Sequence, residues 1–168
     1  MNDEPVSIVD YDPSWPAAFE REARLLDPLL RPWLAGRIEH VGSTAVPGLA
    51  SKPVIDIMAP VESLDAARGA IPEVAALDYC YAPYRSDVMH WFCKPGPSMR
   101  THHLHLVPVN GRLWNERIFF RDTLRLDGRL RREYAELKRT LATANRLDRE
   151  AYTRGKNPFI ERVLRART

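Results

Sequence analysis

The stretch from Val41 to Val61, VGSTAVPGLASKPVIDIMAPV, constrains the fold more strongly than any other part of this chain. Gly42 and Ser43 are a pair of small residues typical of a turn, and a nearly continuous apolar run begins at Val54. Glycine allows the backbone to turn tightly and to approach a ligand closely. An apolar run of this kind is typical of a strand that is covered on both faces. The pattern therefore predicts a short strand, a tight turn, a constrained loop and a buried strand.

The same stretch carries polar groups that suit phosphate. Ser43 and Thr44 offer hydroxyl groups and backbone N–H donors, which are the groups that bind phosphate oxygens. Lys52 adds a point positive charge. Asp56 lies inside the buried run, where an unpaired carboxylate is costly to bury. An acid at this position indicates a metal ion or another cation nearby.

Periodicity on either side of this stretch predicts one α/β domain. Apolar residues recur at helical spacing from Trp15 to Leu30, and a further helix is expected to begin at Ser63. No linker or repeat interrupts the chain, so residues 1–168 are expected to form a single domain: a mixed β-sheet with flanking helices and a C-terminal helical layer. The remaining elements are strands at 6–9, 37–41, 54–61, 79–82, 90–94 and 101–109 and helices at 115–126, 129–144 and 148–164.

Composition limits the classes of partner. The net charge of +3 is mild and the acids are interspersed with the bases, which does not favour a nucleic-acid partner. No stretch has the roughly 20 apolar residues of a membrane span. The N-terminal residues lack a signal-like apolar run, so a cytoplasmic protein is expected. Cys80 and Cys93 lie outside any CxxC pair, and both are expected to be buried, reduced thiols.

The histidines of the segment RTHHLHLV suggest a metal site. His103 and His105 share one face of the strand predicted there, while His102 points to the other face. With Asp56 on an adjacent strand they form a set of two imidazoles and one carboxylate, which suits a divalent transition metal better than magnesium. Two other interpretations remain open. The histidines bind an anion or act as acid and base, or they have a structural role and bond to the backbone or to Asp56.

Basic residues recur beside these motifs. Arg100 precedes the histidine segment, and Arg121 and Arg125 stand one helical turn apart in FFRDTLR. Lys156 follows Tyr152 at a spacing that places both on one helix face. Arg100, Arg121 and Lys156 are candidate phosphate ligands, and surface ion pairing is the alternative for each of them.

The motifs together resemble the GrpB family, which has a nucleotidyltransferase-like fold. The family pattern is close to HxGSTxVPGLxxKPxIDI, and the chain matches it from His40 to Ile57. The resemblance continues through RTHHLHLV, FFRDTLR and REAYTRGKNPFI, and so covers nearly the whole chain. In nucleotidyltransferase folds the Gly-Ser turn holds a triphosphate, and an Asp-hydrophobic-Asp pair on the next strand binds magnesium. Here Met58 stands where the second aspartate is expected, and a thioether is a poor magnesium ligand.

The resemblance implies a protein that binds a nucleotide or another phosphate-bearing small molecule and that transfers a nucleotidyl or phosphoryl group with metal assistance. Asp56, His103 and His105 are the implied catalytic and metal-binding residues. The chain also resembles a domain fused to dephospho-CoA kinase in some bacteria, which implies the alternative of a non-catalytic ligand-binding or folding-assistance module. The implied phosphate-binding residues are Gly42, Ser43, Thr44, Lys52, Arg100, Arg121 and Lys156.

Overall fold

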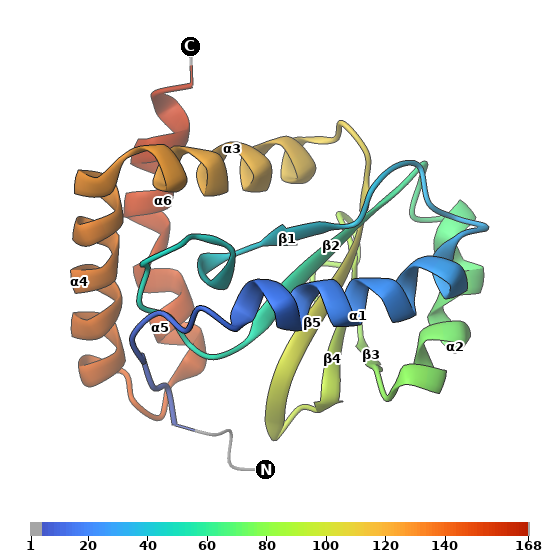
Figure 1. The fold of residues 1–168 in the computed structure, drawn as a ribbon, viewed down its shortest axis with the longest axis horizontal. Coiled ribbons are helices and arrows are strands. Elements are labelled where there is room, and N and C mark those ends of the chain that lie inside the picture. The colour runs from blue at the N-terminus through green and yellow to red at the C-terminus, as the bar shows by residue number, and fades with distance from the viewer. Residues whose placement is uncertain (1–4, 168) are drawn as a thin grey trace.

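A mixed sheet of five strands forms the centre of the computed structural model, which describes residues 5–167 (Figure 1). The strand order is β1-β2-β5-β4-β3, in which β2 and β5 are parallel and the other neighbouring pairs are antiparallel. The mixed sheet is the one that the apolar patterning predicts. Its strands are β1 (Glu39–Val41), β2 (Ile55–Val61), β3 (Cys80–Ala82), β4 (His90–Gly96) and β5 (Met99–Pro108).

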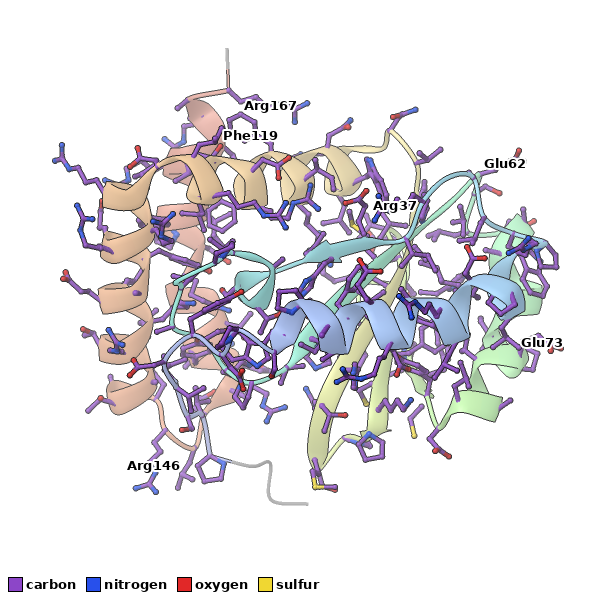
Figure 2. All side chains as sticks on the ribbon, in the orientation of Figure 1. Arg37, Glu62, Glu73, Phe119, Arg146 and Arg167 are labelled. Carbon is purple, nitrogen blue, oxygen red and sulfur yellow. The ribbon has the colours of Figure 1, made fainter. Side chains whose placement is uncertain are left out.

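Helices cover both faces of the sheet and one end of it (Figure 1). Helix α1 (Trp15–Leu30) and helix α2 (Ala70–Val74) pack on one face, and helix α3 (Arg112–Leu126) packs on the other. Helices α4 (Gly128–Ala144), α5 (Arg149–Gly155) and α6 (Asn157–Arg165) form the C-terminal layer. Arg167, which follows α6, contacts α3: its guanidinium lies 5.8 Å from the centre of the Phe119 ring (Figure 2).

The two faces of β2 differ in a way that places the candidate site. Ile55 and Ile57 point into the main core beneath α1, where apolar burial supplies most of the stabilisation. Because successive side chains on a strand alternate between faces, Asp56 and Met58 point to the α3 side. Strand β5 alternates in the same way, with Leu104 and Leu106 in the main core. Asp56, His103 and His105 therefore meet on one face.

Several predicted elements differ in the structure. The predicted strand at 6–9 is an isolated bridge between Val9 and Ser51 rather than a strand of the sheet. The predicted helix at 148–164 is two helices, since Pro158 lies in the first turn of α6 and cannot donate a backbone hydrogen bond to α5. The segment after Ser63 contains short 3-10 turns around α2 instead of one helix.

Exposure also corrects one expectation about the thiols. Cys93 is buried, as expected, whereas Cys80 is exposed because it begins the edge strand β3. Within residues 5–167, no helix combines the length and the apolar character needed to cross a membrane.

Candidate functional site

The turn after β1 lies directly against Asp56. Gly42 has a φ of +72°, and it is followed by a 3-10 turn, Ser43–Ala45. A Cβ atom at Gly42 would lie 2.5 Å from the Asp56 Oδ2 atom, closer than non-bonded atoms approach. Strand pairing explains this proximity, because Val41 and Asp56 are partners in the β1–β2 register. Glycine is therefore required both by the backbone conformation and by the neighbouring carboxylate.

Asp56, His103 and His105 form one compact group. The Asp56 Oδ1 atom lies 3.0 Å from His103 Nδ1 and 3.4 Å from His105 Nε2. Parallel pairing of β2 with β5 produces this arrangement, since Asp56 is the register partner of His103 and His105 lies two residues further on the same face. One candidate ligand atom from each residue lies within 4.8 Å of the others. The structure thus brings together the three residues that the sequence selects.

Burial and hydrogen bonding fix the charge states in this group. Burial opposes ionisation of Asp56, but hydrogen bonds with His103 and His105 outweigh it and hold the Asp56 pKa well below its usual range. Burial lowers the pKa of His105 to about 3, so its imidazole is neutral near pH 7. A carboxylate and a neutral imidazole are the forms that bind metal ions.

The group fits a transition metal in ligand type and spacing. Bonds of about 2.1 Å to a tetrahedral ion place two ligand atoms about 3.4 Å apart, close to the distances from Asp56 to the two histidines. The Nε2 atom of His103 is buried and has no hydrogen-bond partner. Met58, the register partner of His105, is buried and supplies no second carboxylate. The same distances also suit direct hydrogen bonds between the histidines and Asp56. Those bonds are the alternative, structural role of the histidines.

Two lysines predicted to bind phosphate both contact the ring of Tyr152. The Lys52 Nζ atom lies 5.2 Å from the centre of the Tyr152 ring, and the Lys156 Nζ atom lies 4.6 Å from it. Burial lowers the pKa of Lys52 to about 8, and the positive charges of Lys156 and Arg149 add to this effect. Burial also lowers the pKa of Lys156, against the attraction of the Asp56 carboxylate. These lysines are therefore crowded cations that a bound anion would stabilise.

An open pocket of about 370 Å³ adjoins this group. It places Lys52, Arg100 and Arg149 around His103, although these residues come from three distant segments of the chain. The Arg100 guanidinium lies 5.4 Å from the centre of the Trp91 ring, and its Nε donates to the Pro97 carbonyl oxygen at 3.0 Å. The complete lining is Pro5, Ser7, Lys52, Pro53, Val54, Arg100, His103 and Arg149.

Two other candidate phosphate ligands make internal contacts. The Thr44 hydroxyl lies 2.9 Å from His40 Nε2 and donates to the Val54 carbonyl oxygen at 3.3 Å. The Arg121 guanidinium donates to Glu39 Oε2 at 2.7 Å and to the His40 carbonyl oxygen at 2.9 Å. Of the candidate phosphate ligands in the turn, the backbone of Gly42 and the half-buried Ser43 therefore remain beside Asp56. The Arg121 side chain bonds to β1 and not to this part of the site.

Arg117 and Lys138 are basic residues near the site that the sequence did not identify as candidate ligands. Arg117 of α3 is half-buried, and burial lowers its pKa against the attraction of the Asp56 carboxylate. Its position one turn before Arg121 was the available signal. Lys138 of α4 is 2% exposed and donates to the Ala50 carbonyl oxygen at 2.5 Å. Burial lowers the Lys138 pKa to about 6, and no sequence pattern distinguished it from the other bases of α4.

The fold and several relatives agree with the resemblance seen in the motifs. A crystal structure of a conserved GrpB protein from Enterococcus faecalis superposes with a TM-score of 0.85 at 30% identity, covering 95% of this chain and 96% of that one. The Cid1 poly(U) polymerase, with 3'-dATP bound, shares only the fold: the TM-score is 0.58 at 13% identity, over 88% of this chain and 49% of the polymerase. The nucleotidyltransferase-like α/β fold is thus shown.

Sequence relatives give the same family. A UPF0157 protein of Pseudomonas aeruginosa is 39% identical over 97% of this chain and 68% of its own length. A dephospho-CoA kinase of Mycolicibacterium paratuberculosis is 31% identical over 96% of this chain, which spans 46% of that kinase. The profile of the family described as GrpB protein matches residues 5–166. The chain therefore belongs to the GrpB family.

Proposed function

We propose that this chain binds a nucleotide or another phosphate-bearing small molecule in the pocket beside Asp56. The observation that carries the proposal is the gathering of Lys52, Arg100 and Arg149 around His103, with Lys156 on the same tyrosine as Lys52. Burial and the positive charges of Lys156, Arg149 and Arg100 each lower the pKa of Lys52, and an anion with several negative oxygens would offset the repulsion of the Lys52 charge. Nucleotides in the related fold of the Cid1 polymerase are consistent with such a ligand.

The proposal includes a divalent transition metal held by Asp56, His103 and His105. Such an ion, when bound, polarises a phosphoryl oxygen and offsets the charge that develops during group transfer. The chain's own residues bind and orient the ligand: backbone N–H groups at Gly42 and Ser43 face phosphate oxygens, and Lys52 supplies a point charge. Arg117 offers a further cation on the α3 side of Asp56. The corresponding reaction is transfer of a nucleotidyl or phosphoryl group.

A second candidate function is ligand binding without catalysis. Met58 replaces the second carboxylate that magnesium-dependent nucleotidyl transfer requires, and it lies buried beside His105 in the sheet. The relative named dephospho-CoA kinase contains a region similar to this whole chain. A module that binds a phosphate-bearing molecule or assists the folding of a neighbouring domain needs the pocket but not the second acid.

Calorimetric titration with ATP and GTP, in the presence of Mg²⁺, Mn²⁺ or Zn²⁺, tests the binding proposal. The same mixtures analysed for released pyrophosphate or phosphate separate the two functions, because turnover supports the enzyme and binding without turnover supports the module. Absence of binding to either nucleotide and to inorganic polyphosphate, with every metal, would contradict ligand binding in both functions and leave only the folding-assistance role.

The metal assignment has a matched pair of variants. Protein purified without a chelator or an affinity tag is analysed for bound metal, together with His105→Ala and His102→Ala. His105 faces Asp56, whereas His102 lies on the opposite face of the same strand and bonds to the Thr101 hydroxyl at 2.9 Å. Loss of metal in His105→Ala alone is the expected result. Equal metal content in both variants and the unmodified chain would reject this site.

A further inference from the structure

We infer that Cys80 and Cys93 form a thiol–disulfide exchange site, at which a low-molecular-weight disulfide oxidises the pair to a reversible cross-strand bond. Cys80 and Cys93 are register partners in the antiparallel β3–β4 pair, and both are free thiols in the structure. This inference does not depend on the proposed function, because it rests on strand register and exposure alone.

The register places the two sulfur-bearing side chains within reach of each other. Directly opposed residues of an antiparallel pair have Cα atoms about 4.5 or 5.5 Å apart, and disulfides span Cα separations of about 4.4–6.8 Å. Opposed side chains also lie on the same face of the sheet. The adjacent partners Tyr81 and Phe92 show that the register holds, since their rings are in contact on the other face, with centres 5.3 Å apart.

The two thiols differ in exposure, and this difference indicates which of them reacts first. Cys80 is exposed, and its Sγ atom lies 3.4 Å from the Pro95 carbonyl oxygen. Cys93 has no exposed surface, and burial raises the pKa of its thiol. The thiolate is the attacking species in exchange, so access to an external disulfide favours Cys80 as the first residue to react. Cys93 then acts as the resolving thiol.

A disulfide such as oxidised glutathione is the oxidant, and the reaction then balances. The Cys80 thiolate attacks one sulfur of that disulfide, which forms a mixed disulfide and releases one molecule of thiol. Cys93 loses its proton to solvent and attacks the Cys80 sulfur, which forms the protein disulfide and releases the second thiol. Two thiols of the protein are oxidised and one external disulfide is reduced.

The location gives this pair a direct connection to the candidate site. Cys93 is also the register partner of His103 in the β4–β5 pair, and His103 is the partner of Asp56 in the β2–β5 pair. Cys80, Cys93, His103 and Asp56 thus form one row across the sheet, on neighbouring strands and on one face. A covalent link at the edge of this row fixes β3 to β4 beside the strand that carries both histidines.

The folded protein is incubated in glutathione buffers of graded oxidised-to-reduced ratio, quenched by alkylation, and analysed by intact mass. We expect a monomer that is lighter than the reduced chain by two hydrogen atoms and that has no alkylatable thiol. Cys93→Ser should accumulate glutathione on Cys80, whereas Cys80→Ser should keep Cys93 unmodified in the folded state. Thiol reductant should reverse the oxidation of the unmodified chain, and circular dichroism should show that each variant is folded.

Two results would overturn the inference. One is a chain that keeps two alkylatable thiols even in fully oxidised glutathione. The other is a chain that forms only stable mixed disulfides or disulfide-linked dimers, because Cys93 would then be unable to resolve the Cys80 adduct.

Discussion

Gly42 and Asp56 are packed so closely that no side chain fits between them: an added Cβ atom would lie 2.5 Å from one carboxylate oxygen and 3.0 Å from the Asp56 Cβ atom. The turn that we propose to face a phosphate and the carboxylate that we propose to hold a metal therefore share one contact surface. A change in the turn must move the carboxylate, so the two parts of the candidate site are mechanically coupled.

Gly42→Ala is expected to weaken metal binding by at least about tenfold, because the new methyl group displaces the Asp56 carboxylate from His103 and His105. Gly48→Ala is the matched control. Gly48 also has a positive φ, of +78°, but its added Cβ atom would meet only Arg131 Nε, at 3.9 Å. Both variants should lose roughly 1–3 kcal/mol of folding stability from backbone strain. Metal titration of the two folded variants makes the comparison, and equal affinities would show that Gly42 does not position the carboxylate.

Lys156→Met is expected to weaken nucleotide binding with little effect on folding stability. Loss of one charged hydrogen bond costs about 1.5–3 kcal/mol, which corresponds to roughly a tenfold to hundredfold loss in affinity. The free protein should tolerate the change, because Lys156 lies among other cations and on the Tyr152 ring. Calorimetry and thermal unfolding measure the two effects.

Arg154→Met is the control for Lys156, since it removes the same charge two residues earlier from an exposed ion pair with Glu150. Its nucleotide affinity should match that of the unmodified chain. If Lys156→Met binds nucleotide as well as Arg154→Met does, Lys156 is not a ligand of the phosphate and the C-terminal helices only support the fold.

Strand periodicity found most of the central group of the site. Alternation predicts that His103 and His105 share one face of their strand, and the structure brings them together with Asp56. Their adjacency needed only one further fact, the pairing of β2 with β5. The resemblance to the GrpB family supplied the fold, which the structural comparison confirms.

Helix orientation was harder to predict. The spacing of Arg121 and Arg125 shows that they share a helix face, but not that this face meets β1 and the turn after it, some 80 residues earlier in the chain. The contact between Lys138 and Ala50 spans 88 residues in the same way. The exposure of Cys80 depends on β3 being an edge strand, which local sequence does not encode. Contacts over such separations depend on how the layers pack, and periodicity reports only which residues share a face.

Arg121→Met is expected to lower the free energy of unfolding by about 3 kcal/mol, because it leaves Glu39 and the His40 carbonyl without their donor. The Arg121 side chain is 9% exposed and that of Glu39 is 29% exposed, so water replaces the lost bonds only in part. Urea unfolding provides the measurement. Arg112→Met, which removes a 91% exposed side chain from the same helix, should change stability by less than about 0.5 kcal/mol.

Nucleotide affinity distinguishes the two roles considered for Arg121. The internal contacts predict that the folded Arg121→Met protein binds nucleotide as the unmodified chain does, when measured well below its unfolding transition. A large loss of affinity in protein that is fully folded would instead show that Arg121 reaches the ligand, against the bonding seen in the structure.

Lys138 is expected to make folding stability rise with pH between about pH 7 and pH 9. Its pKa is lowered from 10.5 to about 6 in the folded protein by burial and by neighbouring positive charges. Between these values the unfolded chain binds a proton that the folded chain lacks, so raising the pH favours the folded state. One such group contributes at most about 1.4 kcal/mol per pH unit. Lys52, with a pKa of about 8, adds a contribution of the same sign in the upper part of this range.

Lys138→Met should reduce this pH dependence, which urea unfolding at a series of pH values measures directly. The slope is the informative quantity, because the variant also leaves the Ala50 carbonyl without its donor and so lowers stability at every pH. Arg165→Met is the control: it removes a charge that does not titrate in this range, from an exposed pair with Glu161, and Arg165 is not one of the charges that lower the Lys138 pKa. Equal slopes in Lys138→Met and the unmodified chain would mean that Lys138 stays protonated in the folded protein, with its charge held by the Ala50 carbonyl and the Tyr134 ring.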